Sequence, residues 1–304
     1  LFVLTLDFSE YLIPFTVGAM VLTVLFDGRL AMTASVALAV LVSFIIGGKL
    51  DFAIIALFTS MAAIYAVRQL RTRAQLFTAI LFIIISGTVT LVAIGIIKRL
   101  HWTDIGNNML YMTISGVLAP FITYGISALF EMIFGVTSDL TLLELTDFNR
   151  PLLKKLSQEA NGTFNHSVVV GNLAESCANA VEANPLLSRV GAYYHDVGKI
   201  YKPEYFAENM GKDKSIHDQL RPSMSKLIIM SHVKEGMILA REEKLPQPII
   251  DMIPMHHGTT VVEFFYHKAR QEDGEEEENS TEDTEYRYPG PKPTFPEAGI
   301  LMLA

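Results

Sequence analysis

Cysteine is nearly absent from this chain, since Cys177 is the only one among 304 residues. An internal disulfide is therefore excluded, and this usage is consistent with a reducing compartment. Cys177 sits at helical spacing from apolar neighbours, which predicts a small core residue. The chain also lacks the alternation of apolar and polar residues that is typical of strands. We therefore expect an all-α fold.

Charged residues are scarce before position 135, where long apolar runs are separated by short polar breaks. A bilayer core of about 30 Å is crossed by roughly 20 helical residues. The runs predict a polytopic transmembrane bundle in residues 1–135, with the first and third helices short enough to need flanking residues. A hydrophobic soluble bundle is the alternative, but it would have almost no polar surface. The five predicted helices cover residues 11–26, 30–47, 52–67, 74–97 and 109–134.

Basic residues near the helix ends predict the orientation in the membrane. Arg68, Arg71 and Arg73 form the strongest cluster and should face the cytoplasm. Successive connections between helices lie on alternate sides of the membrane, which places everything after the fifth helix on the cytoplasmic side. Lys98 and Arg99 oppose this orientation, because it places them outside. The majority of the charges thus predicts a multi-pass protein of the cell membrane with a cytoplasmic C-terminal part.

Neither end of the sequence carries a terminal signal. Residue 1 is a leucine, and no charged region with a cleavage site follows it as in a signal peptide. Ala304 closes an apolar run without a helix cap. We expect the chain to be a piece of a longer protein at both ends.

Two segments after the bundle have distinctive compositions. Residues 136–150 place leucines at 140, 142, 143 and 145 in a polar background, which predicts a linker that ends where Pro151 opens a helix. Residues 271–285 lack basic side chains and hold nine acidic ones, more than the whole net charge of −8. Such a run predicts a solvated, disordered loop within a helical domain at 151–304.

Histidines recur along the helices predicted in this domain. His166 begins an apolar stripe and is expected to point into the core. Asn184 and Pro185 start a helix that runs to His195-Asp196, after which Gly198 is expected to end it in the left-handed conformation. His232 shares a stripe with apolar residues on a helix at about 223–243, and His256-His257 end one at about 247–257. The stripe of His166 comprises Val169, Val170, Leu173, Cys177 and Val181.

Five histidines and an aspartate at the inner faces or ends of four helices favour a metal site. One histidine on an apolar face is more often a hydrogen-bonded core residue, but six buried polar groups need something to satisfy them. Neutral imidazoles and a carboxylate suit iron, manganese, zinc or cobalt. The set is too large for one ion, and an aspartate can offer one oxygen to each of two metals about 3.5–4 Å apart. Such a pair activates a hydroxide for attack on phosphorus.

His195-Asp196 with Gly198-Lys199, preceded by His166, resembles the HD phosphohydrolase superfamily. Longer segments are similar to one branch, the seven-transmembrane HD family, and the resemblance covers essentially the whole chain. These segments are residues 162–167, 170–175, 190–196, 256–260 and 288–291.

The resemblance implies a membrane-anchored phosphodiesterase that hydrolyses cyclic di-AMP to 5′-pApA. It implies two divalent ions, iron or manganese, a metal-activated hydroxide as nucleophile, and Asp196 as the bridge. A further aspartate is expected directly after Ala304. A first transmembrane helix, an extracellular sensor domain and most of a second helix are expected before Leu1. The implied ligands are His166, His195, Asp196, His232, His256 and His257.

Lys199 is the predicted catalytic cation, which would bind a substrate phosphate and stabilise charge in the transition state. The alternative is a surface lysine at a helix end. Lys202 and Arg221 are weaker candidates for phosphate binding, as is His217 for a phosphate or a base. Arg221 could equally precede a helix as an exposed cap. Adenine stacking is assigned to one of three tyrosines, Tyr194, Tyr201 or Tyr205.

Two other functions stay open at this point. One is an HD hydrolase of cyclic di-GMP or a guanosine alarmone, although Gly258-Thr259-Thr260 lacks the GYP motif of the cyclic di-GMP branch. The other is a receptor that binds a nucleotide without hydrolysing it. The expected partners are a cyclic dinucleotide and the lipid bilayer, and not a nucleic-acid polymer. Assembly into a homo-oligomer is left open.

Overall fold

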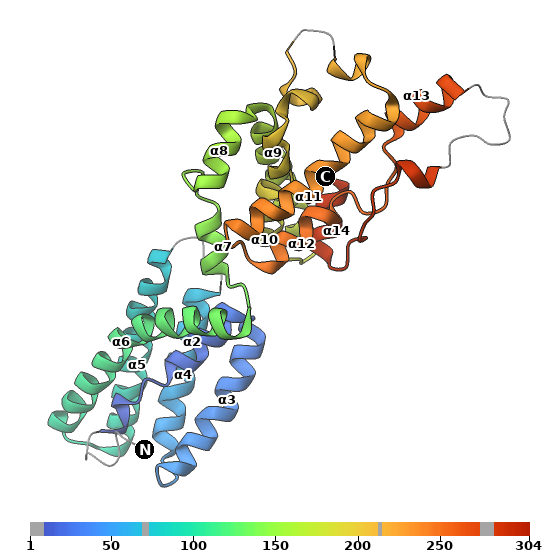
Figure 1. Ribbon diagram of the computed structural model, residues 1–304. Coiled ribbons are helices and arrows are strands. Elements are labelled where there is room, and N and C mark those ends of the chain that lie inside the picture. Colours follow the sequence, from blue (N-terminus) through green and yellow to red (C-terminus); the bar gives the residue numbers. More distant parts are fainter. Residues whose placement is uncertain (1–8, 69–72, 212–214, 274–282) are drawn as a thin grey trace. The chain divides into compact units, whose positions relative to one another are not determined.

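The computed structural model describes residues 9–68, 73–211, 215–273 and 283–304. The chain divides into two compact units, Leu1–Leu143 and Glu144–Ala304. Figure 1 shows the helices of each unit, and the described residues contain no strand beyond an isolated bridge between Val261 and Arg287. The predicted all-α fold is confirmed.

The first unit is a bundle in which α4 packs between α3 and α5, and α2 lies against α3, α4 and α6 (Figure 1). Capping residues begin and end its helices. The Asp27 carboxylate accepts hydrogen bonds from the backbone of Arg29 and Leu30 at the start of α3, and Gly135 ends α6 in the left-handed conformation. The helices are α2 (Thr16–Leu25), α3 (Gly28–Ile45), α4 (Leu50–Val67), α5 (Arg73–Lys98) and α6 (Trp102–Phe134).

Four of these helices, α3 to α6, are long and apolar enough to cross a membrane. The predicted helix at 11–26 is divided into a 3-10 turn, η1 (Glu10–Leu12), and the ten-residue α2, so it is shorter than predicted, and its crossing of the membrane stays a prediction. Pro14 separates the two, since proline disfavours helical geometry in the residue before it. The last span also begins earlier than predicted, at Trp102 instead of residue 109.

Large apolar side chains cover the outside of the bundle. Phe44 is 74% exposed and Ile97 is 80% exposed, whereas small residues such as Ala31 and Ala63 are fully buried. Soluble proteins rarely expose apolar surface on this scale, while lipid tails provide a solvent for it. The soluble-bundle alternative is therefore excluded.

The predicted linker at 136–150 is partly helical. It contains α7 (Asp139–Leu145), and the boundary between the units falls inside that helix. The Glu131 carboxylate fixes the start of α7, because it accepts hydrogen bonds from the Ser138 amide and the Thr141 hydroxyl. Leu140, Leu142 and Leu145 are buried.

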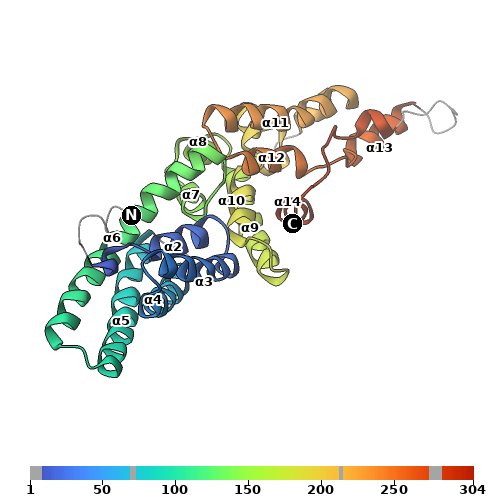
Figure 2. The same cartoon turned by 90° about the horizontal axis from the view of Figure 1, so that it is seen from below.

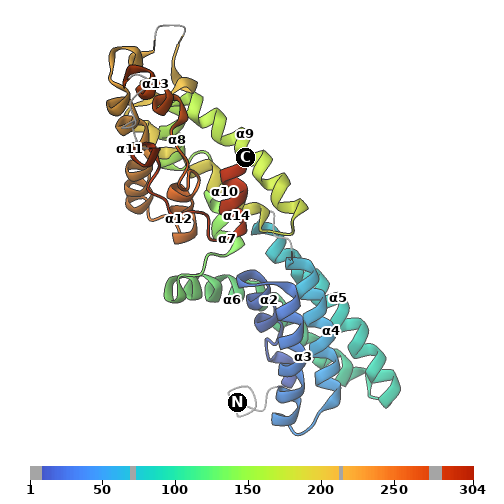
Figure 3. The same ribbon diagram turned by 90° about the vertical axis from the view of Figure 1, so that its right-hand side faces the viewer.

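The second unit is built around α9, which packs against α8, α10 and α14 (Figure 3). Helix α12 packs against α10 and α11 (Figure 2). Four 3-10 turns connect α10 to α11, at Val197–Tyr201 (η2), Pro203–Tyr205 (η3), Ala207–Asn209 (η4) and Ile216–Gln219 (η5). The helices are α8 (Pro151–Glu159), α9 (Asn161–Ala180), α10 (Pro185–Tyr194), α11 (Pro222–Glu242), α12 (Gln247–Met255), α13 (Glu263–Asp273) and α14 (Pro296–Leu303).

The predicted inner face of α9 is wrong. Val169 is 67% exposed, Val181 is 63% exposed, and Cys177 and His166 are exposed, so most of the predicted stripe faces outward. Val170 is the member of that stripe that is buried, and the rest of the buried face carries small residues, namely Thr163, Ser167, Gly171, Ala174 and Ala178. A Cβ on Gly171 would lie 2.6 Å from the Tyr193 ring, so close packing against α10 selects small side chains over large apolar ones.

The acidic segment 271–285 is ordered at both ends, which corrects the prediction of a loop throughout. Gln271–Asp273 complete α13, and Asp283–Tyr286 form the 3-10 turn η6. Tyr286 is buried against Phe265 and Ala269, which anchors the C-terminal end of the segment. The remaining positions, 274–282, lie outside the described residues.

Gly198 does not adopt the predicted left-handed conformation. It lies in η2, where a Cβ would sit 1.9 Å from the His232 carbonyl oxygen and 2.5 Å from the Gly236 nitrogen. The glycine is therefore required by the close approach of η2 to α11, which brings His195-Asp196 next to His232.

We expect Gly198→Ala to destabilise the second unit by about 1–3 kcal/mol or more, because the added methyl group overlaps backbone that cannot rotate away. The measurement is thermal unfolding of the purified protein. Gly211→Ala is the control, since a Cβ there meets nothing within 4 Å. Equal unfolding temperatures for the two variants would contradict the role of this contact.

Candidate metal centre

The six predicted ligands come together in the second unit. His166 lies on α9, His195 and Asp196 follow the last turn of α10, His232 lies on α11, and His256 and His257 follow α12. Their ring centroids form a chain of neighbours at 5.5 Å (166 to 195), 4.8 Å (195 to 256), 4.0 Å (256 to 257) and 5.2 Å (257 to 232). Two groups have ligand atoms within 4.8 Å of one another: His166, His195 and Asp196, and His232, His256 and His257.

Three of the rings are held by the same backbone contact. The Nδ1 atoms of His195, His232 and His256 lie 2.7, 2.5 and 2.6 Å from the carbonyl oxygen three residues earlier. A carbonyl oxygen can only accept, so each Nδ1 carries the proton and each Nε2 of a neutral ring carries a lone pair. Metal-binding histidines usually have this arrangement.

Asp196 lies at the centre of the cluster and is 2% exposed. Its Oδ2 atom is 3.1 Å from His195 Nε2, and its Oδ1 atom is 3.3 Å from His232 Nε2 and 3.6 Å from His256 Nε2. Among the described residues, no group donates a hydrogen bond to Oδ1 or to the Nε2 atoms of His232 and His256. Buried acceptors that face one another repel unless a cation lies between them.

Four of the imidazoles, those of His166, His232, His256 and His257, are neutral near pH 7. Burial is the main cause that lowers the pKa of His166, His232 and His256, and that of His256 falls well below its usual range. Burial and the neighbouring His232 lower the pKa of His257 to about 3. The donor set therefore includes four neutral rings and one carboxylate, which fits divalent transition metals.

Asp196 is the anion of the cluster. Burial alone would raise the pKa of its carboxyl group, but His195 and the Lys199 ammonium outweigh burial and hold that pKa well below its usual range. Lys199 Nζ is 2.8 Å from Asp196 Oδ2. The predicted catalytic pair is thus in direct contact.

Two residues at the site were missed by sequence reasoning. Glu208 in η4 lies 2.8 Å from Lys199 Nζ, and a lone acidic residue in a loop gives no signal of such a role. Tyr288 stacks on His257 with ring centroids 4.0 Å apart and planes 10° apart. The backbone of Tyr288 donates to the Thr260 carbonyl, which holds its segment beside the residues that follow His257.

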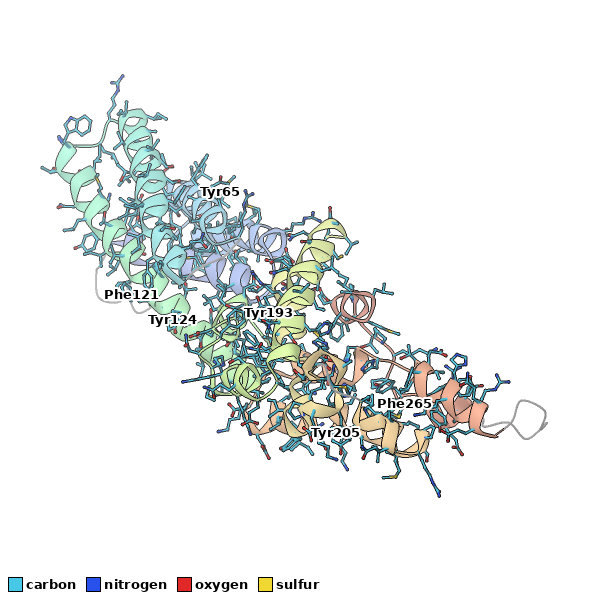
Figure 4. The ribbon with its side chains drawn as sticks, turned by 90° about the horizontal axis from the view of Figure 1, so that it is seen from above. Tyr65, Phe121, Tyr124, Tyr193, Tyr205 and Phe265 are labelled. Atoms are coloured by element: carbon cyan, nitrogen blue, oxygen red, sulfur yellow. The ribbon has the colours of Figure 1, made fainter. Side chains whose placement is uncertain are left out.

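The weaker phosphate candidates lie at the surface of the loop and the next helix. Lys202 is exposed where η2 ends, and Arg221 is exposed at the N-cap of α11, as the cap alternative predicts. His217 is buried, with Nε2 2.8 Å from the Tyr205 carbonyl oxygen and its ring between those of Tyr205 and Phe265, both labelled in Figure 4. His217 therefore stabilises the loop between α10 and α11.

The three tyrosines proposed for adenine stacking differ in accessibility. Tyr194 is 1% exposed and its hydroxyl donates to the Leu145 carbonyl, so Tyr194 is excluded. Tyr205 is partly buried against His217. Tyr201, which is 51% exposed, is the most accessible of the three.

Comparison with known proteins gives two family matches. Residues 1–138 match the family described as a 7TM receptor with intracellular HD hydrolase, and residues 163–304 match the HD domain family. The two matches correspond to the apolar bundle and to the domain that contains the histidine cluster.

Curated relatives match the chain across both units. It is 37% identical over 302 residues to the cyclic-di-AMP phosphodiesterase PgpH of Bacillus subtilis, which covers 97% of this chain and 42% of the relative. It is 43% identical over 194 residues to PgpH of Listeria monocytogenes, covering 64% of this chain and 26% of the relative. The chain thus spans less than half the length of these relatives.

A solved structure of the Listeria PgpH HD domain in complex with cyclic-di-AMP is 45% identical in sequence. The match covers 52% of this chain and 72% of that chain, with a TM-score of 0.48. The two family matches and the relatives together assign the chain: it belongs to the family of 7TM receptors with an intracellular HD hydrolase, and it is a membrane protein that carries a helical HD domain.

Proposed function

We propose that this chain hydrolyses cyclic di-AMP to 5′-pApA at a centre of two divalent ions held by the histidine cluster. The observation that carries the proposal is the convergence of buried acceptors without donors, Asp196 Oδ1 and the Nε2 atoms of His232 and His256. The Nδ1 atoms of His232 and His256 already donate their protons to backbone carbonyls, and a bound cation would satisfy all three acceptor atoms at once.

Asp196 is suited to bridge two ions. Its Oδ2 atom faces His195 at 3.1 Å and His166 at 3.9 Å, whereas its Oδ1 atom faces His232 and His256. One ion would be held by His166, His195 and Asp196, and the other by His232, His256, His257 and Asp196. Iron and manganese both suit this donor set. When bound, the two ions would supply an activated water and positive charge for the phosphoryl oxygens.

The charges of the site also favour bound cations. Asp196 and Glu208 are anionic, Lys199 is a cation, and the rings with lowered pKa values are neutral. The protein groups alone therefore repel a cyclic dinucleotide, which carries two phosphodiester charges. Divalent ions reverse the sign of the field, which explains how an anionic substrate binds here.

Lys199 is the proposed contact to the reacting phosphate. Two of its three ammonium protons are used by Asp196 and Glu208, each at 2.8 Å, and the third can bind a phosphoryl oxygen as negative charge develops. Lys202 and Arg221 are assigned to the second phosphate, and Tyr201 to an adenine. The names of the Bacillus and Listeria relatives support cyclic di-AMP over cyclic di-GMP.

We also assign the HD domain to the cytoplasm. Arg68 is described, and its guanidinium lies 4.5 Å from the centroid of the Tyr65 ring, an arrangement typical of a membrane interface. Arg71 and the side chain of Arg73 lie outside the described residues. Lys49 and Lys98, which alternation places on the other side, pair with Glu10 and Asp51.

His195→Ala and Asp196→Ala should each lower kcat for cyclic di-AMP by more than about 100-fold, because loss of a supporting contact alone costs about 10–100-fold. The measurement is turnover by the intact protein loaded with manganese or iron. His267→Ala is the control, since His267 is exposed on α13. Binding without turnover by the loaded wild type would favour a receptor, and preferred turnover of cyclic di-GMP would overturn the substrate.

The metal-free protein should lose stability as the pH falls below about 6.5. A histidine has a pKa near 6.5 when unfolded, and the folded rings have lower pKa values, so the unfolded state binds more protons in this range. The unfolding temperature measured in chelator should fall steadily from pH 7.5 to pH 4.5. The unfolding temperature of His257→Gln should fall less steeply over this range. A wild-type unfolding temperature that does not change with pH would contradict neutral buried imidazoles.

Cys177 tests the orientation, because it is exposed on α9 of the HD domain. In a version of the intact protein whose only cysteine is Cys177, a membrane-impermeant maleimide should label it only after cells are permeabilised. Cys177→Ser is the background control. Labelling in sealed cells would contradict a cytoplasmic HD domain.

A further inference from the structure

Glu208 connects the catalytic lysine to the helix that carries His166. Its Oε1 atom lies 2.8 Å from Lys199 Nζ and accepts a hydrogen bond from the Thr163 hydroxyl at 2.9 Å. Thr163 stands one turn before His166 on α9. The Glu208 side chain is 28% exposed, so the contact is screened from water only in part.

The contact is held by the backbone around it. Asn209 accepts from the Thr163 amide at 3.0 Å and donates to the Thr163 hydroxyl at 2.8 Å. A Cβ on Gly162 would lie 1.8 Å from the Glu208 carbonyl oxygen, so only glycine permits η4 to approach α9 this closely. The position of the Glu208 carboxylate is therefore set by two elements, η4 and the first turn of α9.

Lys199 needs such a partner. Its ammonium sits between Asp196 Oδ2 and Glu208 Oε1, with the Phe206 ring centroid 4.9 Å away. The lysine side chain is flexible and its ammonium has no preferred direction of its own. Asp196 shares its charge with the ions when they are bound, which leaves Glu208 as the anion that keeps Lys199 in place.

We propose that Glu208 is a positioning residue that directs the free N–H of Lys199 toward the reacting phosphate. This inference rests on the proposed phosphodiesterase function. Glu208 also places a negative charge near an anionic substrate, so its benefit lies in the transition state, where a well-placed donor counts most, and not in substrate binding.

The test compares Glu208→Gln with Glu204→Gln, a matched change at an exposed glutamate of η3 in the same loop. Glutamine keeps an oxygen for the Thr163 hydroxyl but loses the charge that holds Lys199. In the metal-loaded intact protein, Glu208→Gln should lower kcat for cyclic di-AMP by about 10–100-fold, because a catalytic group misplaced by about 1 Å can cost about 100-fold. KM should stay equal or decrease, and Glu204→Gln should match the wild type.

A double-mutant cycle separates positioning from a structural role. If Glu208 acts through Lys199, then Lys199→Met and the Lys199→Met, Glu208→Gln double variant should have the same kcat. A further loss in the double variant would show that Glu208 acts through Thr163 instead, and it would overturn the proposal. So would an unchanged kcat in Glu208→Gln.

The same proteins assayed with bis(p-nitrophenyl) phosphate distinguish failure of the substrate assignment from failure of this inference. If only this diester is turned over and the double-mutant cycle gives the predicted result, the positioning role of Glu208 is supported and cyclic di-AMP is rejected as the substrate. If cyclic di-AMP is turned over but the double-mutant cycle does not give the predicted result, only the positioning role of Glu208 is rejected. Absence of turnover on both diesters by the loaded wild type would reject both proposals.

Discussion

The structure of the HD domain depends on one buried anion, the Asp196 carboxylate, which lies among the imidazoles of the histidine cluster. Burial of a charge in a protein interior is costly unless it is paired. Lys199 pairs with one oxygen, while the other faces the lone pairs of His232 and His256. Cations bound between these acceptors would stabilise the arrangement, so the cluster relates the stability of the domain to its chemistry.

The packing around Asp196 follows from this constraint. Four helices must bring their histidines within a few ångströms of one carboxylate, and bulky side chains between them would prevent it. Gly198 allows η2 to meet the backbone of α11, and Gly171 allows α9 to approach the Tyr193 ring of α10. Backbone carbonyls then orient three of the rings, so the ligand atoms are directed before any metal arrives.

The all-α fold, the apolar bundle and the six clustered side chains could be predicted from the sequence, because they depend on periodicity and residue chemistry. The face of α9 could not, because that helix packs through small residues such as Gly171 and Ala174 while its larger apolar side chains stay exposed. The first span was overestimated because Pro14 interrupts an otherwise apolar run. Glu208 could not be found, since its role depends on the fold of a loop that brings it to Lys199.

The most direct test of the account is anomalous X-ray diffraction, recorded at the iron and manganese edges from crystals of the intact protein. We expect two peaks flanking Asp196, one bonded to His166 and His195 and the other to His232, His256 and His257, with His195, His232 and His256 bound through Nε2. No anomalous peak at the cluster in protein supplied with both metals would contradict it.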